Sequence, residues 1–89
     1  MHLTLDQLRQ QIQKLREGDD TRESLARWAR VQRDLVRTGR LRYEPAHHSY
    51  RLSRGLAMLA TLDVRRPNSE WVIDDQELAM LLRRMSGGV

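Results

Sequence analysis

The sequence contains no cysteine, so neither a disulfide framework nor a thiolate metal site can stabilise the fold. No apolar run approaches the roughly 20 residues of a membrane-spanning helix, and the start of the chain lacks the basic region and apolar stretch of a secretion signal. With 89 residues, the chain is long enough for a packed core but not for a deep substrate cavity. We therefore expect one cytoplasmic domain, residues 1–89, held together by packing and with no membrane contact.

Signatures of catalysis are also missing. The sequence has no glycine-rich nucleotide fingerprint and no P-loop. His47 and His48 are adjacent, so a helix turns them about 100° apart and a strand points them to opposite sides, and neither arrangement suits one metal ion. Asp74, Asp75 and Glu77 form the densest carboxylate cluster, but acids are favoured in the first turn of a helix, and no nucleophile lies nearby. We expect a binding protein with no enzymatic activity, small-molecule substrate, metal or cofactor.

Residues 20–38 carry the strongest helical pattern of the chain. Side chains of one face recur there every three or four residues: Leu25, Trp28, Ala29, Gln32, Leu35 and Val36. Charged residues occupy the remaining positions. Because Trp28 is the largest side chain of that face, we expect it at the centre of the core.

Local capping signals define the other helices. The predicted capping boxes pair Thr4 with Gln7 and Asp74 with Glu77, and Gly18 and Gly39 stand where the first two helices would end. Together with the apolar stripes, they predict helices near 4–17, 20–38, 49–62 and 74–86. The expected fold class is all-α: a compact four-helix bundle with short connections and an irregular segment at 39–48.

Residues 39–55 are compatible with two structures. In one, Pro45 lies in a loop and Ser49 opens the third helix, whose buried stripe would be Leu52, Leu56, Leu59 and Leu62. In the other, residues 41–43 and 50–52 form a hairpin that protrudes as a wing. The spacing L-V-x-x-G-x-L followed by Y-x-L resembles winged-helix DNA-binding domains, in which Arg40, Arg42 and Arg51 would lie beside phosphate.

The net charge of +4 is concentrated in the middle of the chain. Residues 21–54 hold nine arginines against three acids, whereas the segments before and after are each slightly acidic. On the helix predicted for residues 20–38, Arg22, Arg30, Arg33 and Arg37 form a basic arc. This arc could contact phosphate or an acidic partner, or could simply keep the helix soluble.

Three segments resemble small bacterial immunity-type proteins of toxin/immunity systems, including the colicin D immunity type. They are G-D-D-T-R-E-S-L-A-R-W-A at residues 18–29, G-L-A-M-L-A-T-L-D at 55–63 and W-V-I-D-D-Q-E-L at 71–78. The resemblance implies a cytoplasmic helical bundle that covers the active cleft of a cognate toxin's C-terminal domain. This chain departs from the pattern in being basic, since inhibitors of nucleases are usually acidic.

The resemblance also implies where the toxin would bind. If the toxin is a nuclease, its cleft is basic and would meet the local acidic surface of this chain. That predicted toxin-binding set is Asp63, Glu70, Asp74, Asp75 and Glu77. If the partner is acidic, the alternative binding set is Arg30, Arg33 and Arg37, and the same arginines would form the recognition helix of the winged-helix alternative.

Overall fold

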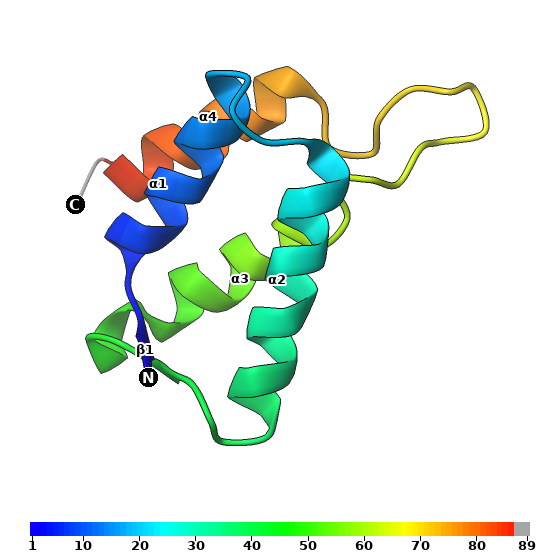
Figure 1. Ribbon diagram of the computed structural model, residues 1–89. Coiled ribbons are helices and arrows are strands. Elements are labelled where there is room, and N and C mark those ends of the chain that lie inside the picture. Colours follow the sequence, from blue (N-terminus) through cyan, green and yellow to red (C-terminus); the bar gives the residue numbers. More distant parts are fainter. Residues whose placement is uncertain (87–89) are drawn as a thin grey trace.

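The computed structural model describes residues 1–86 and contains four α-helices with a short parallel strand pair (Figure 1). The elements in chain order are β1 (His2–Leu3), α1 (Leu5–Arg16), α2 (Arg22–Arg37), β2 (Arg42–Tyr43), the 3-10 helix η1 (Ala46–His48), α3 (Ser49–Leu59) and α4 (Asp75–Ser86). All four predicted helices are present, each within three residues of its expected ends. No helix in residues 1–86 combines the length and the apolar character needed to cross a membrane.

The helix ends follow the local capping signals. The Thr4 hydroxyl accepts a hydrogen bond from the Gln7 N–H at 3.2 Å, and the Gln7 side chain accepts one from the Thr4 N–H at 3.0 Å, which completes the predicted box. Gly18 and Gly39 have φ angles of +84° and +78°, the left-handed conformation that ends α1 and α2. At α4, a carboxylate oxygen of Asp74 accepts from the Glu77 N–H at 2.8 Å, the N-cap half of the second box.

The helices pack in two pairs, α1 against α4 and α2 against α3, and α1 also contacts α3 (Figure 1). The side chains at the centre of the core are completely buried and are almost all leucines: Leu8, Ile12, Leu25, Leu52, Leu56, Leu59 and Leu62. The prediction that Trp28 occupies this centre is wrong, because Trp28 is only partly buried and packs on the core from its edge. Ala26 and Ala29 are the fully buried neighbours of Trp28 on α2, and such small side chains let two helices approach closely and leave no room for an indole between them.

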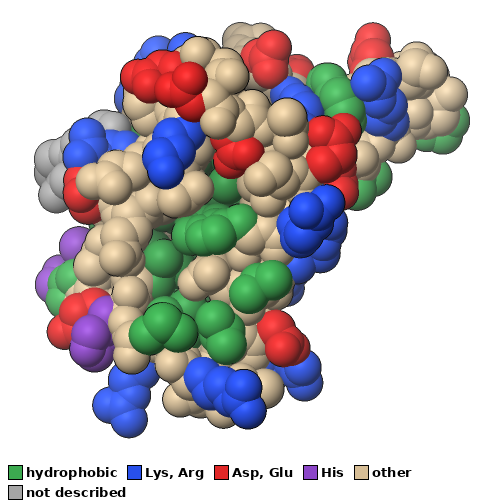
Figure 2. All heavy atoms as spheres, viewed as in Figure 1, with side chains coloured by type: hydrophobic (Ala, Val, Ile, Leu, Met, Phe, Trp, Pro, Cys, Tyr) green, Lys and Arg blue, Asp and Glu red, His purple; other side chains and the backbone are tan. Residues whose placement is uncertain are grey.

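Trp28 lies instead beside a surface hollow between α1 and α2. Leu3 and Leu41 line the same hollow together with the glutamines Gln7, Gln10, Gln11 and Gln32. Figure 2 shows hydrophobic side chains exposed on this face of the molecule. The indole therefore has one apolar side on the core and one side toward solvent.

The segment after α2 resolves the choice between loop and hairpin. Residues 49–59 form α3, so the predicted hairpin at 40–53 is wrong and the loop-plus-helix prediction is confirmed. Residues 42–43 are extended, but they pair in parallel with the start of the chain, His2 opposite Arg42 and Leu3 opposite Tyr43. The expected irregular segment 39–48 thus contains β2 and η1.

Gly55 lies where α3 crosses α1. A Cβ atom at this position would lie 2.7 Å from a methyl carbon of Leu8 and 3.1 Å from the terminal carbon of Met85. Glycine weakens a helix interior by about 1 kcal/mol relative to alanine, so its presence in α3 is explained by this close contact.

A loop between α3 and α4 projects beyond the helices (Figure 1). Its two arms are antiparallel: the Val72 N–H donates to the Val64 carbonyl at 3.1 Å, and Arg65 pairs with Trp71. The tip turns at Ser69, whose φ angle is +71°. The loop brings the end of the α3 region and the start of α4 side by side.

Candidate functional site

The projecting loop is fixed to α2 by Arg22. Its guanidinium donates to the carbonyl oxygens of Leu62 at 3.1 Å and Ile73 at 2.6 Å, and to a carboxylate oxygen of Asp75 at 2.8 Å. It also lies 4.4 Å from the ring centre of Trp71. Only 11% of the Arg22 side chain is exposed. Arg22 was predicted to belong to the basic arc, but it holds the two ends of the loop and the start of α4 together.

The Trp71 ring contacts two guanidinium groups. The Arg65 guanidinium lies 4.0 Å from the ring centre, and Arg22 also contacts the ring. Arg65 also donates to the Ser69 carbonyl at 3.2 Å, so it joins the tip of the loop to its arm. Cation–π contacts of this kind are each worth about 0.5–1 kcal/mol at exposed sites. The loop therefore has a defined conformation although most of its residues are exposed.

Arg30 makes the second connection between α2 and the loop. Two of its nitrogens donate to the two carboxylate oxygens of Asp63 at 3.2 and 3.1 Å, and one of them donates to the Ala60 carbonyl at 3.0 Å. The hydrogen bond from Arg30 lowers the pKa of Asp63 from its usual range. One residue of the predicted basic arc and one of the predicted acidic set thus neutralise each other.

The five residues of the predicted acidic set all lie in the loop or in the first turn of α4. The five carboxylates differ in how freely they could contact a partner. Asp63 pairs with Arg30, and Asp74 caps α4. Asp75 contacts Arg22 but keeps 95% of its side chain exposed. Glu70 is exposed in the second arm of the loop, and Glu77 is partly buried. The structure therefore brings the predicted set to one end of the molecule, with two of the five carboxylates paired to arginine.

The alternative set, Arg30, Arg33 and Arg37, lines a shallow hollow on the outer side of α2 together with Asp34. Arg37 forms an ion pair with Asp34, and the hydrogen bond between them raises the pKa of Arg37. Figure 2 shows basic and acidic side chains next to one another along this side of the molecule. Two of the three arginines are thus paired, which weakens the positive field that the sequence suggests.

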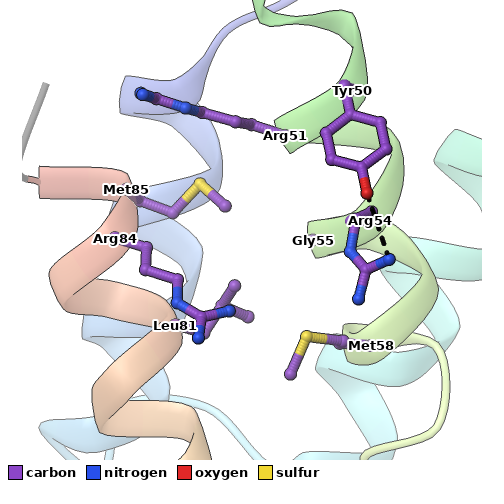
Figure 3. A pocket seen from close by; sticks show the side chains of 8 residues that line it. All are labelled: Tyr50, Arg51, Arg54, Gly55, Met58, Leu81, Arg84 and Met85. Carbon is purple, nitrogen blue, oxygen red and sulfur yellow. Dashed lines mark hydrogen bonds between the residues drawn. The ribbon is translucent and has the colours of Figure 1, made fainter. Parts of the chain in front are cut away.

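The sequence did not indicate one further hollow among the residues that the structure describes. It lies between α3 and α4 and has a volume of about 360 Å³ (Figure 3). The lining combines apolar side chains with three arginines: Tyr50, Gly55, Met58, Leu81 and Met85, with Arg51, Arg54 and Arg84. Tyr50 and Met80 beside it are 72% and 46% exposed. The available signal was the spacing of Tyr50, Arg54 and Met58 at every fourth residue, outside the predicted core stripe.

His47 and His48 lie in η1 with their rings edge to face, 4.4 Å apart between centres. Burial lowers the pKa of His48, and the neighbouring charges of His47 and Arg51 lower it further. Among residues 1–86, no group of three histidine or carboxylate side chains is placed to hold a metal ion.

Comparisons of this chain with protein-family models, with curated proteins and with solved structures found no match.

Proposed function

We propose that this chain is an immunity protein that binds the C-terminal domain of a cognate bacterial toxin, a nuclease, and neutralises it by covering its active or substrate-binding surface. The proposal keeps the interpretation that the three immunity-type segments suggest. In it, the chain acts in the cytoplasm as a compact four-helix bundle and carries out no catalysis.

The observation that supports this proposal best is the fixed position of the acidic segment. Arg22 and Arg30 hold the base of the projecting loop against α2 through three backbone carbonyls and two carboxylates. Glu70 and Asp74 nevertheless remain exposed. A surface that is ordered before binding loses less conformational entropy on association. Close pairs of opposite charge across an interface can couple by about 1.5–7 kcal/mol, so a few such carboxylates are enough to recognise a basic cleft.

The structure determines which carboxylates should be reversed in a test. Asp63, Asp74 and Asp75 have structural contacts, so their replacement would disturb the loop as well as the charge. No hydrogen bond or ion pair of the Glu70 or Glu77 side chain is present in the described part of the chain. The double variant Glu70→Lys/Glu77→Lys is therefore the suitable one, and Asp19→Lys/Glu23→Lys is its matched control, with the same change of charge at exposed positions elsewhere.

The partner to test is the C-terminal domain of a secreted protein encoded beside this chain. We expect the parent chain to copurify with that domain and to protect cells that express it. Glu70→Lys/Glu77→Lys should weaken binding by about 100-fold or more. This estimate assumes that each reversal removes one charge pair with the toxin worth about 1.5 kcal/mol. The control variant should bind like the parent, and circular dichroism should show that both variants are folded.

Equal protection by the parent and by Glu70→Lys/Glu77→Lys would place the toxin interface elsewhere. A parent chain that neither binds the neighbouring domain nor protects against it would end the immunity proposal. The winged-helix alternative has lost the hairpin on which it depended, because residues 49–59 are helical.

A further inference from the structure

The hollow between α3 and α4 is one part of a longer groove. Two smaller hollows adjoin it, one beside Ala57, Thr61 and Ile73 and the other beside Glu77 and Met80. All three share Met58. The two helices line the groove in opposite directions. At one end of the groove the start of α3 faces the end of α4, and at the other the end of α3 faces Ile73, just before α4. The groove thus follows most of the 11 residues of α3, a length of about 16 Å.

The floor and the rim of this groove differ in chemistry. Met58, Leu81 and Met85 form the floor, and Figure 3 shows the two methionine side chains directed into the space between the helices. Methionine is unbranched and polarisable, so a floor of this kind adapts to apolar side chains of different shape. Gly55 also lines the main hollow, where the absence of a side chain lets α3 lie close to Leu8 and Met85.

The rim is basic. Arg54 and Arg84 line the main hollow from opposite sides, one on α3 and one on α4, and Arg51 lines it as well. Arg54 lies against the ring of Tyr50, 5.6 Å from the ring centre, and donates to the tyrosine hydroxyl at 3.3 Å (Figure 3). No ion pair of Arg54 or Arg84 with a carboxylate is present in residues 1–86. The guanidinium groups are therefore placed to receive carboxylates from outside.

We infer that this groove binds an acidic amphipathic helix of another protein. The three hollows meet at Met58 and form one apolar groove between α3 and α4, and grooves of this kind bind the apolar face of an amphipathic helix. Arginines on both edges complement a helix whose apolar stripe is flanked by glutamate or aspartate. The inference goes beyond the toxin interface proposed above, since it concerns the groove between α3 and α4 and a partner of opposite charge, and the two surfaces share only Glu77 among the residues named for them.

The direct test uses a designed probe. It is a fluorescein-labelled helical peptide of about 15 residues with leucine at every third or fourth position and glutamate on both flanks. We expect saturable binding by fluorescence anisotropy, weakened by added salt because the rim contributes charge. A peptide with every glutamate replaced by lysine should bind about tenfold more weakly or not at all.

Two pairs of protein variants locate the site. Arg84→Glu should weaken the peptide about tenfold or more, whereas Arg83→Glu changes the same charge at a neighbour that the helix turns about 100° away. Met80→Asp should weaken it likewise, whereas Val31→Asp introduces the same group on α2 at a residue of similar exposure, 50% against 46%. Both control variants should bind like the parent.

Three results would overturn the inference. One is the absence of saturable peptide binding by the parent chain. The second is an equal loss in Arg83→Glu and Arg84→Glu, because that result means non-specific attraction. The third is a parent chain that does not bind the peptide but binds phosphatidylglycerol vesicles or self-associates in sedimentation, provided that Met80→Asp abolishes this other binding. That outcome would assign the groove to a lipid surface or to a second copy of the chain.

Discussion

Replacing Arg22 with methionine should destabilise the domain by about 2–4 kcal/mol. Methionine keeps the apolar stem of the side chain and removes the guanidinium. Hydrogen bonds from a charged donor contribute about 1.5–3 kcal/mol each, and Arg22 makes two of them to partly buried carbonyls, those of Leu62 and Ile73. The contact with the Trp71 ring adds about 0.5–1 kcal/mol. The ion pair with Asp75 adds little, because that carboxylate is almost fully exposed. Water can hydrate part of the site that the guanidinium leaves. The expected loss of stability is therefore smaller than the sum of these contributions.

Urea unfolding followed by circular dichroism measures this loss. A domain of this kind has a total stability of about 5–15 kcal/mol, so the predicted change is easily resolved. Arg33→Met is the matched control, since Arg33 is an exposed arginine of the same helix, and it should change stability by less than about 0.5 kcal/mol. Amide hydrogen exchange should show that residues 62–75 lose protection first in the Arg22 variant, because the contacts that it removes lie there.

Asp75→Asn separates the backbone contacts of Arg22 from its ion pair. We expect this variant to lose less than about 1 kcal/mol, since the pair is exposed. The reasoning would be refuted if Arg22→Met cost less than 1 kcal/mol and left exchange at residues 62–75 unchanged. It would also be refuted if Asp75→Asn were as destabilising as Arg22→Met, because the ion pair and not the carbonyl contacts would then hold the loop.

Three further predictions concern the core and its ion pairs. Gly55→Ala should lower the free energy of unfolding by about 1 kcal/mol in urea titrations, because crowding against Leu8 outweighs the gain in helix propensity; a more stable variant would contradict this. Trp28→Ala should cost about 1–3 kcal/mol, less than the 3–5 kcal/mol of a fully buried aromatic residue, and a larger loss would restore it to the centre of the core. Because Arg30 lowers the pKa of Asp63 in the folded state, the contribution of Asp63 is present above the unfolded pKa of about 3.9 and is lost as the pH falls through the folded pKa. Urea midpoints at neutral pH and near pH 3 should therefore differ more for the parent than for Asp63→Asn.

The helices could be predicted from sequence because their limits depend on neighbours in the chain. The Thr4 and Gln7 box and the left-handed Gly18 and Gly39 involve residues within a few positions of each helix end. The position of Trp28 in the core depends instead on how closely α2 approaches α3. A helical wheel gives the face on which a residue lies, but not which part of that face meets the neighbouring helix.

The contacts of the arginines could not be predicted for a related reason. Arg22 bonds to carbonyls 40 and 51 positions further along the chain, and a backbone carbonyl has no sequence signature. The charge pattern alone favours a solvated face for such a residue. The α3–α4 groove could not be predicted for the same reason, because it forms only where residues far apart in the sequence, such as Met58 of α3 and Leu81 of α4, come together.

These contacts also change how the net charge of the chain should be interpreted. The excess of arginine seemed to conflict with a basic partner, but Arg22 and Arg30 are engaged in holding the loop and Arg37 is paired with Asp34. In the same way, Arg22 offsets the charge of Asp75 and Arg30 offsets that of Asp63. Among the predicted acids, Glu70, Asp74 and Glu77 are then the ones that no arginine pairs with in the described residues. A partner meets the local field of these acids and not the overall charge, because exposed charges more than about 10 Å apart are largely screened at physiological salt. If the acidic set is the toxin-binding site, reversal of Glu70 and Glu77 should therefore affect binding more than any change in the total charge of the chain.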